Sequence, residues 1–271
     1  MKKFATVWVV LLFATGCGGS GEAVPPTTTL PPTTTTAAPL TTADLLGALP
    51  TVLNLPSGWS SSGDPVTSLD PKTGEGFGIC GKGNEHSRAI ANNMVAFAGS
   101  PSFRTTEGGW SRLGLYSFGT EEDAEGFVAL TVSQANCPDG LEYEQEEGEN
   151  WEDGLVDLFL HADMDGQVWT HLEHVSLGSA SGGDADEAFF ITSRNEYLTN
   201  TESGAYGNKD SRITIYERHG RLVISHATSG ACCSYGYSNV DATDDYTPKF
   251  DEVSASLDIL RPHVLDALPD K

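Results

Sequence analysis

The side chains best suited to ligand contact lie in two neighbouring segments, residues 155–162 and 168–177. Apolar and polar residues alternate along both segments, and the Asp-Met-Asp-Gly sequence between them ends at Gly166, so the pattern predicts a β-hairpin. The register that separates the two faces most cleanly gathers two aromatic and two imidazole side chains on one face: Phe159, His161, Trp169 and His171.

Imidazole beside carboxylate can bind zinc or move protons, and carboxylates share this predicted face. The same register, however, pairs Phe159 with His171 and His161 with Trp169, so the two histidines are not cross-strand partners. We therefore interpret these four residues as a ligand-contacting face or as an ordinary sheet surface. We expect no metal and no cofactor.

The motifs of common enzyme classes are absent from the sequence. The segment 178–182 reads Gly-Ser-Ala-Ser-Gly, with alanine where the nucleophilic serine of a G-x-S-x-G motif would stand. Neither a phosphate-binding glycine loop nor a zinc-protease helix motif occurs. We expect the protein not to be an enzyme.

Acidic residues concentrate between Glu142 and Asp153, where seven of twelve residues are Asp or Glu. We interpret this segment as a solvated loop, with calcium binding as the alternative. Calcium needs six to eight converging oxygens, which this spacing does not indicate.

Four cysteines lie in the body of the chain: Cys80, Cys137, Cys232 and Cys233. In an oxidising compartment they are expected to form two disulfides. A bond between the adjacent Cys232 and Cys233 would need a strained ring. Two connectivities remain open, and each joins Cys232 and Cys233 separately to the two earlier cysteines. Zinc binding is the alternative, but the sequence has no C-x-x-C spacing.

The first residues have the features of an export signal. Two lysines precede an apolar run, Phe4 to Phe13, which is too short for a permanent membrane span. Ala-Thr-Gly then precedes Cys17 and is similar to the lipobox of bacterial lipoproteins, although alanine stands where the family usually has leucine. This resemblance implies a lipoprotein signal peptide at residues 1–16 and a diacylglyceryl group on Cys17. Two acyl chains anchor a protein stably to a membrane.

Residues 17–42 are rich in Pro and Thr and predict an extended stalk, with O-glycosylation left open. The whole chain has 38 acidic and 15 basic residues and a formal charge of -23. Such a charge argues against nucleic acid as a partner, because both would be polyanions. The expected location is the extracytoplasmic face of the cell membrane.

The remaining residues, 43–271, predict one globular domain. Thr42 can cap a first helix, and acids after Thr120 are typical of the first turn of a second. Apolar residues at helical spacing near the C-terminus indicate a third helix, which Pro262 should end or kink. The predicted helices are 43–49, 119–137 and 250–268. The predicted strands are 93–98, 110–118, 155–162, 168–177, 188–197, 213–218 and 221–227. The last two form a hairpin around His219 and Gly220, with Ile213, Ile215, Leu222 and Ile224 on one face. This order predicts an α+β fold, a mainly antiparallel sheet packed against helices.

The lipobox, the Pro/Thr stalk, the short helix with Leu45-Leu46 and the helix ending at Cys137 resemble actinobacterial cell-wall lipoproteins. The order of elements is similar to the extracellular sensor domain of PknH-type receptor kinases. That resemblance implies two disulfides and a cleft between the sheet and the helices, but it transfers no ligand-binding residue.

Two functions follow as hypotheses. The first is a membrane-anchored binding or sensor-like module for a lipid, a glycan or a small apolar molecule, which would use Phe159, His161, Trp169 and His171. The second is an interaction or adhesion module that presents acidic and aromatic loops to another envelope protein.

Overall fold

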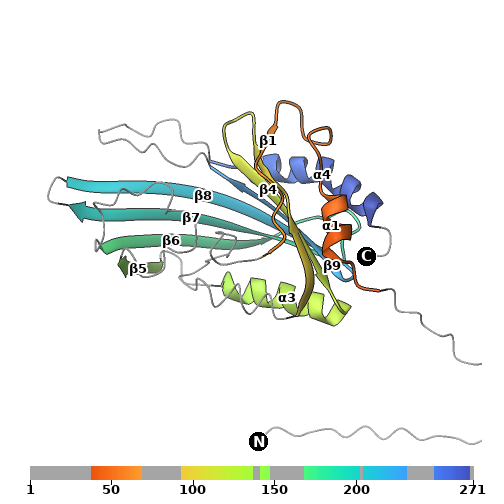
Figure 1. Cartoon of the computed structure of the whole chain (residues 1–271). Coiled ribbons are helices and arrows are strands. Elements are labelled where there is room, and N and C mark those ends of the chain that lie inside the picture. Colours follow the sequence, from red (N-terminus) through yellow and green to blue (C-terminus); the bar gives the residue numbers. More distant parts are fainter. Residues whose placement is uncertain are drawn as a thin grey trace, which may run out of the picture. The chain divides into compact units, whose positions relative to one another are not determined.

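The computed structural model describes residues 38–68, 93–136, 141–146, 168–201, 204–230 and 247–268 (Figure 1). These residues belong to one compact unit, Ala37–Lys271. The last residues of the segment expected to be a stalk belong to this unit, since Leu40 packs against the core and Arg221 donates to the Ala38 carbonyl at 3.2 Å.

Side-chain caps define the beginnings of two helices. Helix α1 (Thr42–Ala48) starts one residue earlier than predicted, because Thr41 rather than Thr42 is the N-cap and forms a capping box with Asp44. Helix α3 (Glu121–Gln134) begins after Thr120, whose hydroxyl accepts a hydrogen bond from the Asp123 N–H. Three acids in the first turn of α3 complement the helix dipole.

Helix α4 (Phe250–Ala267) continues through Pro262 instead of ending there. Proline removes one helical hydrogen bond, which would normally favour an end or a kink. The residues beyond it are held in place by packing, since Val264 and Leu268 are buried in the core.

The described strands form one antiparallel sheet in the order β1-β3-β4-β9-β8-β7-β6-β5, and β2 also pairs with β4. Their bounds are β1 Ser60–Ser62, β2 Met94–Gly99, β3 Ser102–Arg104, β4 Trp110–Phe118, β5 Leu141–Glu146, β6 Val168–Ser179, β7 Glu187–Thr201, β8 Gly204–His219 and β9 Leu222–Ser229. The predicted α+β class with a mainly antiparallel sheet is confirmed.

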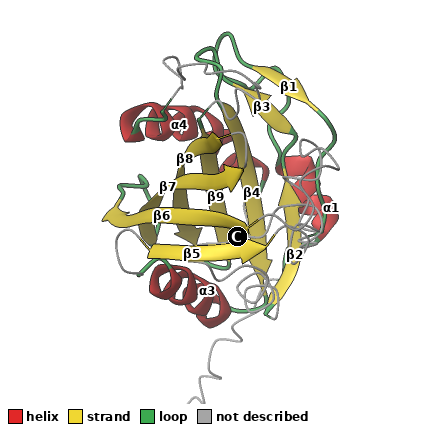
Figure 2. Ribbon diagram, turned by 90° about the vertical axis from the view of Figure 1, so that its left-hand side faces the viewer, coloured by secondary structure: helices red, strands yellow, loops and turns green. Residues whose placement is uncertain are grey.

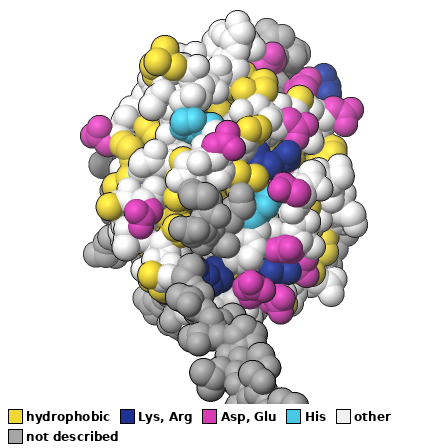
Figure 3. Space-filling model, turned by 90° about the vertical axis from the view of Figure 1, so that its right-hand side faces the viewer, with side chains coloured by type: hydrophobic (Ala, Val, Ile, Leu, Met, Phe, Trp, Pro, Cys, Tyr) yellow, Lys and Arg dark blue, Asp and Glu magenta, His cyan; other side chains and the backbone are white. Residues whose placement is uncertain are grey.

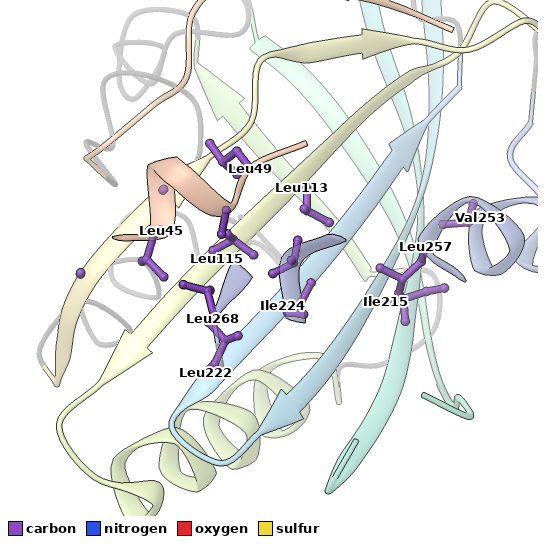
Figure 4. Close-up of a cluster of buried hydrophobic side chains, with 14 of the residues drawn as sticks. Leu45, Leu49, Leu113, Leu115, Ile215, Leu222, Ile224, Val253, Leu257 and Leu268 are labelled. Carbon is purple, nitrogen blue, oxygen red and sulfur yellow. The ribbon is translucent and has the colours of Figure 1, made fainter. Parts of the chain in front are cut away.

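Helices cover both faces of the sheet (Figure 2). On one face, α1 and α4 pack against alternate residues of β4, β8 and β9, including Leu115, Ile215 and Ile224, as Figure 4 shows. On the other face, Ala124, Phe127 and Val128 of α3 pack in a second cluster that contains Tyr116 and Tyr216. Period-two alternation of buried apolar residues therefore builds two cores on one sheet.

The β8–β9 hairpin confirms the predicted sharing of a face by Ile213, Ile215, Leu222 and Ile224. Its turn lies one residue later than predicted, at Gly220 and Arg221, since His219 pairs with Leu222. Gly220 has φ of 58°, a left-handed conformation that glycine adopts without strain. Moving the turn by one residue shifts the partner of every residue by two positions along the opposite strand. Because side chains alternate between the faces with a period of two, the same residues stay on the same face.

The acidic segment 142–153 was expected to be a loop, and this expectation is wrong for its first residues, which belong to β5. Leu141, Tyr143 and Gln145 alternate with Glu142, Glu144 and Glu146 in that strand. Alternation is the strand signal, and the density of acids obscured it. Residues 147–153 lie outside the described residues.

Candidate functional site

Two of the four predicted contact residues, Trp169 and His171, lie in β6. Phe159 and His161 lie outside the described residues, as do Cys17 and the cysteines expected to form disulfides: Cys80, Cys137, Cys232 and Cys233. The disulfide and lipidation expectations therefore stay predictions. Trp169 and His171 are two positions apart in one strand, so they share a face of the sheet, as expected.

The predicted pairing of His171 with Phe159, and of Trp169 with His161, is wrong. One edge of β6 pairs with β5, where Tyr143 lies opposite His171 and Gln145 opposite Trp169. The other edge pairs with β7. Both edges of β6 are thus occupied at these positions, and no third strand can pair with them.

The register of four strands gathers aromatic and hydrogen-bonding residues in two adjacent rows. One row is Tyr143–His171–Tyr197–Asn208, and the next is Gln145–Trp169–Thr199–Tyr206. Directly paired residues lie on the same face of an antiparallel sheet. We call these eight residues the aromatic–polar face. Sequence reasoning found two of its members and missed the other six, because their approach depends on pairing between distant strands.

The dimensions of this face follow from sheet geometry. Neighbouring strands are roughly 4.8 Å apart and alternate residues along a strand roughly 7 Å apart, so four strands and two rows cover roughly 14 by 7 Å. By sequence, the eight paired positions are four aromatic residues, one histidine, one asparagine, one glutamine and one threonine. Rings with polar neighbours offer both flat apolar contact and directional hydrogen bonds.

The aromatic–polar face continues the side of the sheet that α3 covers. Farther along the same strands, that side carries Val175, Ile191 and Tyr216 of the second core. Figure 1 shows β5 and the adjacent ends of β6–β8 extending past the end of α3. The acids Glu142, Glu144 and Glu146 of β5 alternate with its face residues and belong to the opposite side.

A second polar arrangement lies where β9 meets α4. The His226 ring is fully buried, and its Nε2 lies 2.8 Å from the Ser256 hydroxyl. That hydroxyl donates to the Val253 carbonyl at 2.8 Å, so His226 Nε2–H donates to Ser256 Oγ. Burial lowers the pKa of His226 to about 4, although the charge of Glu217 opposes this change. The imidazole is therefore neutral near neutral pH.

A serine next to a histidine invites comparison with a catalytic pair. A catalytic histidine must accept the serine proton on one nitrogen while an acceptor holds the other N–H. Here His226 Nδ1 is buried with no hydrogen-bond partner among the described residues, and the Ser256 proton is directed to the backbone. The geometry fits a structural link between β9 and α4.

A third arrangement joins α4 to β8 through charges. Arg261 donates two hydrogen bonds of 2.6 Å to the carboxylate of Glu217, whose side chain is 1% exposed. His219 Nε2 lies 3.6 Å from the same carboxylate, and Asp258 contacts Arg261 at 2.9 Å. Burial would raise the pKa of Glu217, but the nearby His219 and the bonds from Arg261 lower it below its ordinary value. This cluster fixes α4 on the sheet.

The described residues contain no group of three or more His, Cys, Asp or Glu side chains placed to hold a metal ion. Among the helices in the described ranges, none combines the length and apolar character that crossing a bilayer requires.

Comparison with known proteins found no matching family model and no matching curated protein. Among solved structures, the chain is similar to the extracellular domain of PknH from Mycobacterium tuberculosis. The two share 12% sequence identity with a TM-score of 0.45, and the match covers 86% of this chain and 98% of that domain.

Proposed function

We propose that the protein is a lipid-anchored extracytoplasmic module that binds a glycan on the aromatic–polar face. The observation that carries this proposal is the register of β5–β8, which gathers Tyr143, Trp169, Tyr197 and Tyr206 with His171 in two rows. A ligand site needs apolar surface together with a few placed polar groups, and these rows contain both. The two rows span roughly 14 by 7 Å.

A glycan fits these residues better than a lipid does. The hydroxyls of a sugar need hydrogen-bonding partners, and Gln145, Thr199 and Asn208 lie among the aromatic residues. A lipid tail would desolvate these groups without pairing them, which costs free energy. A small apolar molecule would meet the same penalty.

Sequence features near the N-terminus support the lipid anchor. The basic and apolar residues before Cys17 match a lipoprotein signal, and the Pro/Thr-rich segment would hold the domain away from the membrane. On the side of the molecule that Figure 3 shows, acidic side chains are spread widely, with basic side chains among them. A strongly acidic domain is repelled by anionic lipid, so a stalk lets it work at a distance.

Binding is tested with residues 17–271 carrying Cys17→Ser, secreted behind an ordinary signal peptide. Envelope oligosaccharides are titrated into this protein and into two variants. Trp169→Ala removes an aromatic residue of the face and should weaken binding about tenfold or more. Thr170→Ala changes the next residue of β6, which belongs to the opposite face, and should leave the affinity unchanged. Equal effects of the two substitutions would refute the site.

Lipidation is tested separately in cells by incorporation of a labelled fatty acid. The wild-type chain should carry the label and partition into the membrane fraction, while Cys17→Ser should do neither. Labelling that persists in Cys17→Ser would contradict the predicted anchor.

Interaction with an envelope protein is the second candidate function, and a turn after α1 favours it. Val52 and Leu53 are 66% and 91% exposed. Asn54 Oδ1 accepts hydrogen bonds of 2.9 Å from the Thr51 N–H and hydroxyl, which orders the turn. Two adjacent aliphatic side chains on this turn are therefore accessible to a partner. A Leu53→Ser variant that retains glycan binding but loses cross-linking to a neighbouring protein would support this candidate.

A further inference from the structure

A small pocket opens between α4 and the segment before β1. Its volume is about 230 Å³. An apolar cavity of roughly 150 Å³ holds one benzene ring, so this pocket accommodates a single ring or a short branched chain. Its lining is mainly apolar and comes from Pro56, Trp59, Val253, Ala255 and Ile259.

Packing on the protein side holds Trp59 in the pocket wall. The indole ring stacks on buried His226 with ring centroids 6.4 Å apart and an angle of 13° between the planes. It also contacts Phe103 at 6.5 Å between centroids. Beside it, Ile259 remains 53% exposed. The wall thus offers an aromatic surface supported from behind and an aliphatic side chain that is about half exposed.

The hydroxyl groups that line the pocket are already satisfied within the protein. Ser256 donates to the Val253 carbonyl and accepts from His226, while Thr228 donates to the Ser111 hydroxyl at 3.3 Å. The Thr105 hydroxyl accepts from the Gly109 N–H at 2.9 Å. An apolar group can therefore displace water from the pocket without leaving these groups unpaired, and this removes the usual penalty for covering polar atoms.

Two exposed carboxylates complete the lining. Glu107 comes from the turn between β3 and β4, and Glu252 from the first turn of α4. The hydrogen bond from Thr106 lowers the pKa of Glu107, so this group is ionised at neutral pH. Glu252 pairs with Lys249 at 3.1 Å, but Lys249 is 77% exposed. A pair so exposed is weak, and another cation can compete for the carboxylate.

We propose that this pocket is a second binding site, which takes an organic cation: one aromatic or aliphatic group with an adjacent ammonium. The apolar group lies against Trp59 and Ile259, and the ammonium faces Glu107 and Glu252. The site is separate from the aromatic–polar face and does not depend on glycan binding there.

The test compares two probes of nearly equal shape, 2-phenylethylammonium and the neutral 2-phenylethanol. Binding is followed by the NMR signal of the Trp59 indole N–H, assigned by its absence in Trp59→Phe, in residues 17–271 with Cys17→Ser. At low salt the ammonium should bind about two- to fivefold more tightly than the alcohol, and high salt should remove the difference.

Variants separate the charge from the pocket. Glu107→Gln with Glu252→Gln should equalise the two probes, whereas Glu121→Gln with Glu122→Gln on α3 removes as much charge elsewhere and should leave the preference intact. Lys249→Gln should strengthen the preference. Ala255→Phe, at an exposed helix position, should block both probes.

Three results would overturn the proposal. One is the absence of a saturable shift for either probe, which denies the pocket. Another is equal affinity of the two probes for the wild type. The third is an ammonium preference that survives Glu107→Gln with Glu252→Gln, which would assign the effect to the overall charge of the protein.

Discussion

Replacing Arg261 by methionine tests how α4 is held on the sheet. The substitution keeps a long apolar side chain but removes both 2.6 Å hydrogen bonds to Glu217. The Glu217 side chain is 1% exposed and the Arg261 side chain 11% exposed, so the carboxylate would be left buried without its cation. Removing one partner of such a buried pair lowers the free energy of unfolding by about 3–5 kcal/mol.

The loss should be measured by urea unfolding, which leaves the ionic strength low. In a domain of this size, a loss of about 3–5 kcal/mol in unfolding free energy corresponds to a fall of roughly 10 °C in Tm. Removing both partners, with Glu217→Leu and Arg261→Met together, should restore most of the stability, because no buried charge remains. The sum of the two single losses in unfolding free energy should therefore exceed the loss in the double variant by about 2 kcal/mol or more.

The pH dependence gives an independent check. The pKa of Glu217 is below its ordinary value of 4.5 in the folded protein. A lowered carboxyl pKa stabilises the fold above the ordinary pKa, and the stabilisation is lost as the pH falls through the folded pKa. In Arg261→Met, burial raises the Glu217 pKa instead. The difference between wild type and variant should be largest at neutral pH and should shrink below about pH 4.

A loss smaller than about 1 kcal/mol in Arg261→Met would refute the reasoning. So would a double variant as unstable as the sum of the two single variants, because the partners would then act independently.

Three further predictions concern single positions. The pKa of His226 is lowered from 6.5 to about 4, so the free energy of unfolding should decrease as the pH falls below 6.5, by up to about 3 kcal/mol. An NMR titration should find the His226 ring still neutral at about pH 5.5. Thr120→Ala removes the α3 cap and should cost about 1 kcal/mol in urea unfolding, whereas Thr120→Ser should cost almost nothing. Gly178→Ala places a Cβ 2.3 Å from the Phe190 ring and should lower Tm, and Phe190→Leu in the same chain should restore part of the loss.

Local patterns were sufficient to predict much of the fold. Strand β4 runs from Trp110 to Phe118, as its composition predicted, and α3 begins after Thr120. The two-faced alternation of β8 and β9 was also predictable, even though the turn lies at Gly220 and Arg221. These features depend on residues close in sequence, where capping and period-two alternation act.

Contacts between distant segments were not predictable in this way. Tyr143 and His171 are paired positions because β5 pairs with the edge of β6, whereas the many acids of β5 indicated a loop. The link between His226 and Ser256, and the ion pair of Glu217 with Arg261, join the sheet to α4 over long stretches of chain. No local spacing marks such pairs, because their geometry depends on where the helix packs.

The most direct test of glycan binding is a pair of mass spectra of residues 17–271 with Cys17→Ser, after incubation with an extract of envelope glycans. The native spectrum should show added mass that disappears on denaturation and has the composition of sugar residues. The same added mass should be absent from Trp169→Ala and present in Thr170→Ala. A bare mass for the parent protein, or added mass that Trp169→Ala retains, would contradict the aromatic–polar face as the binding site.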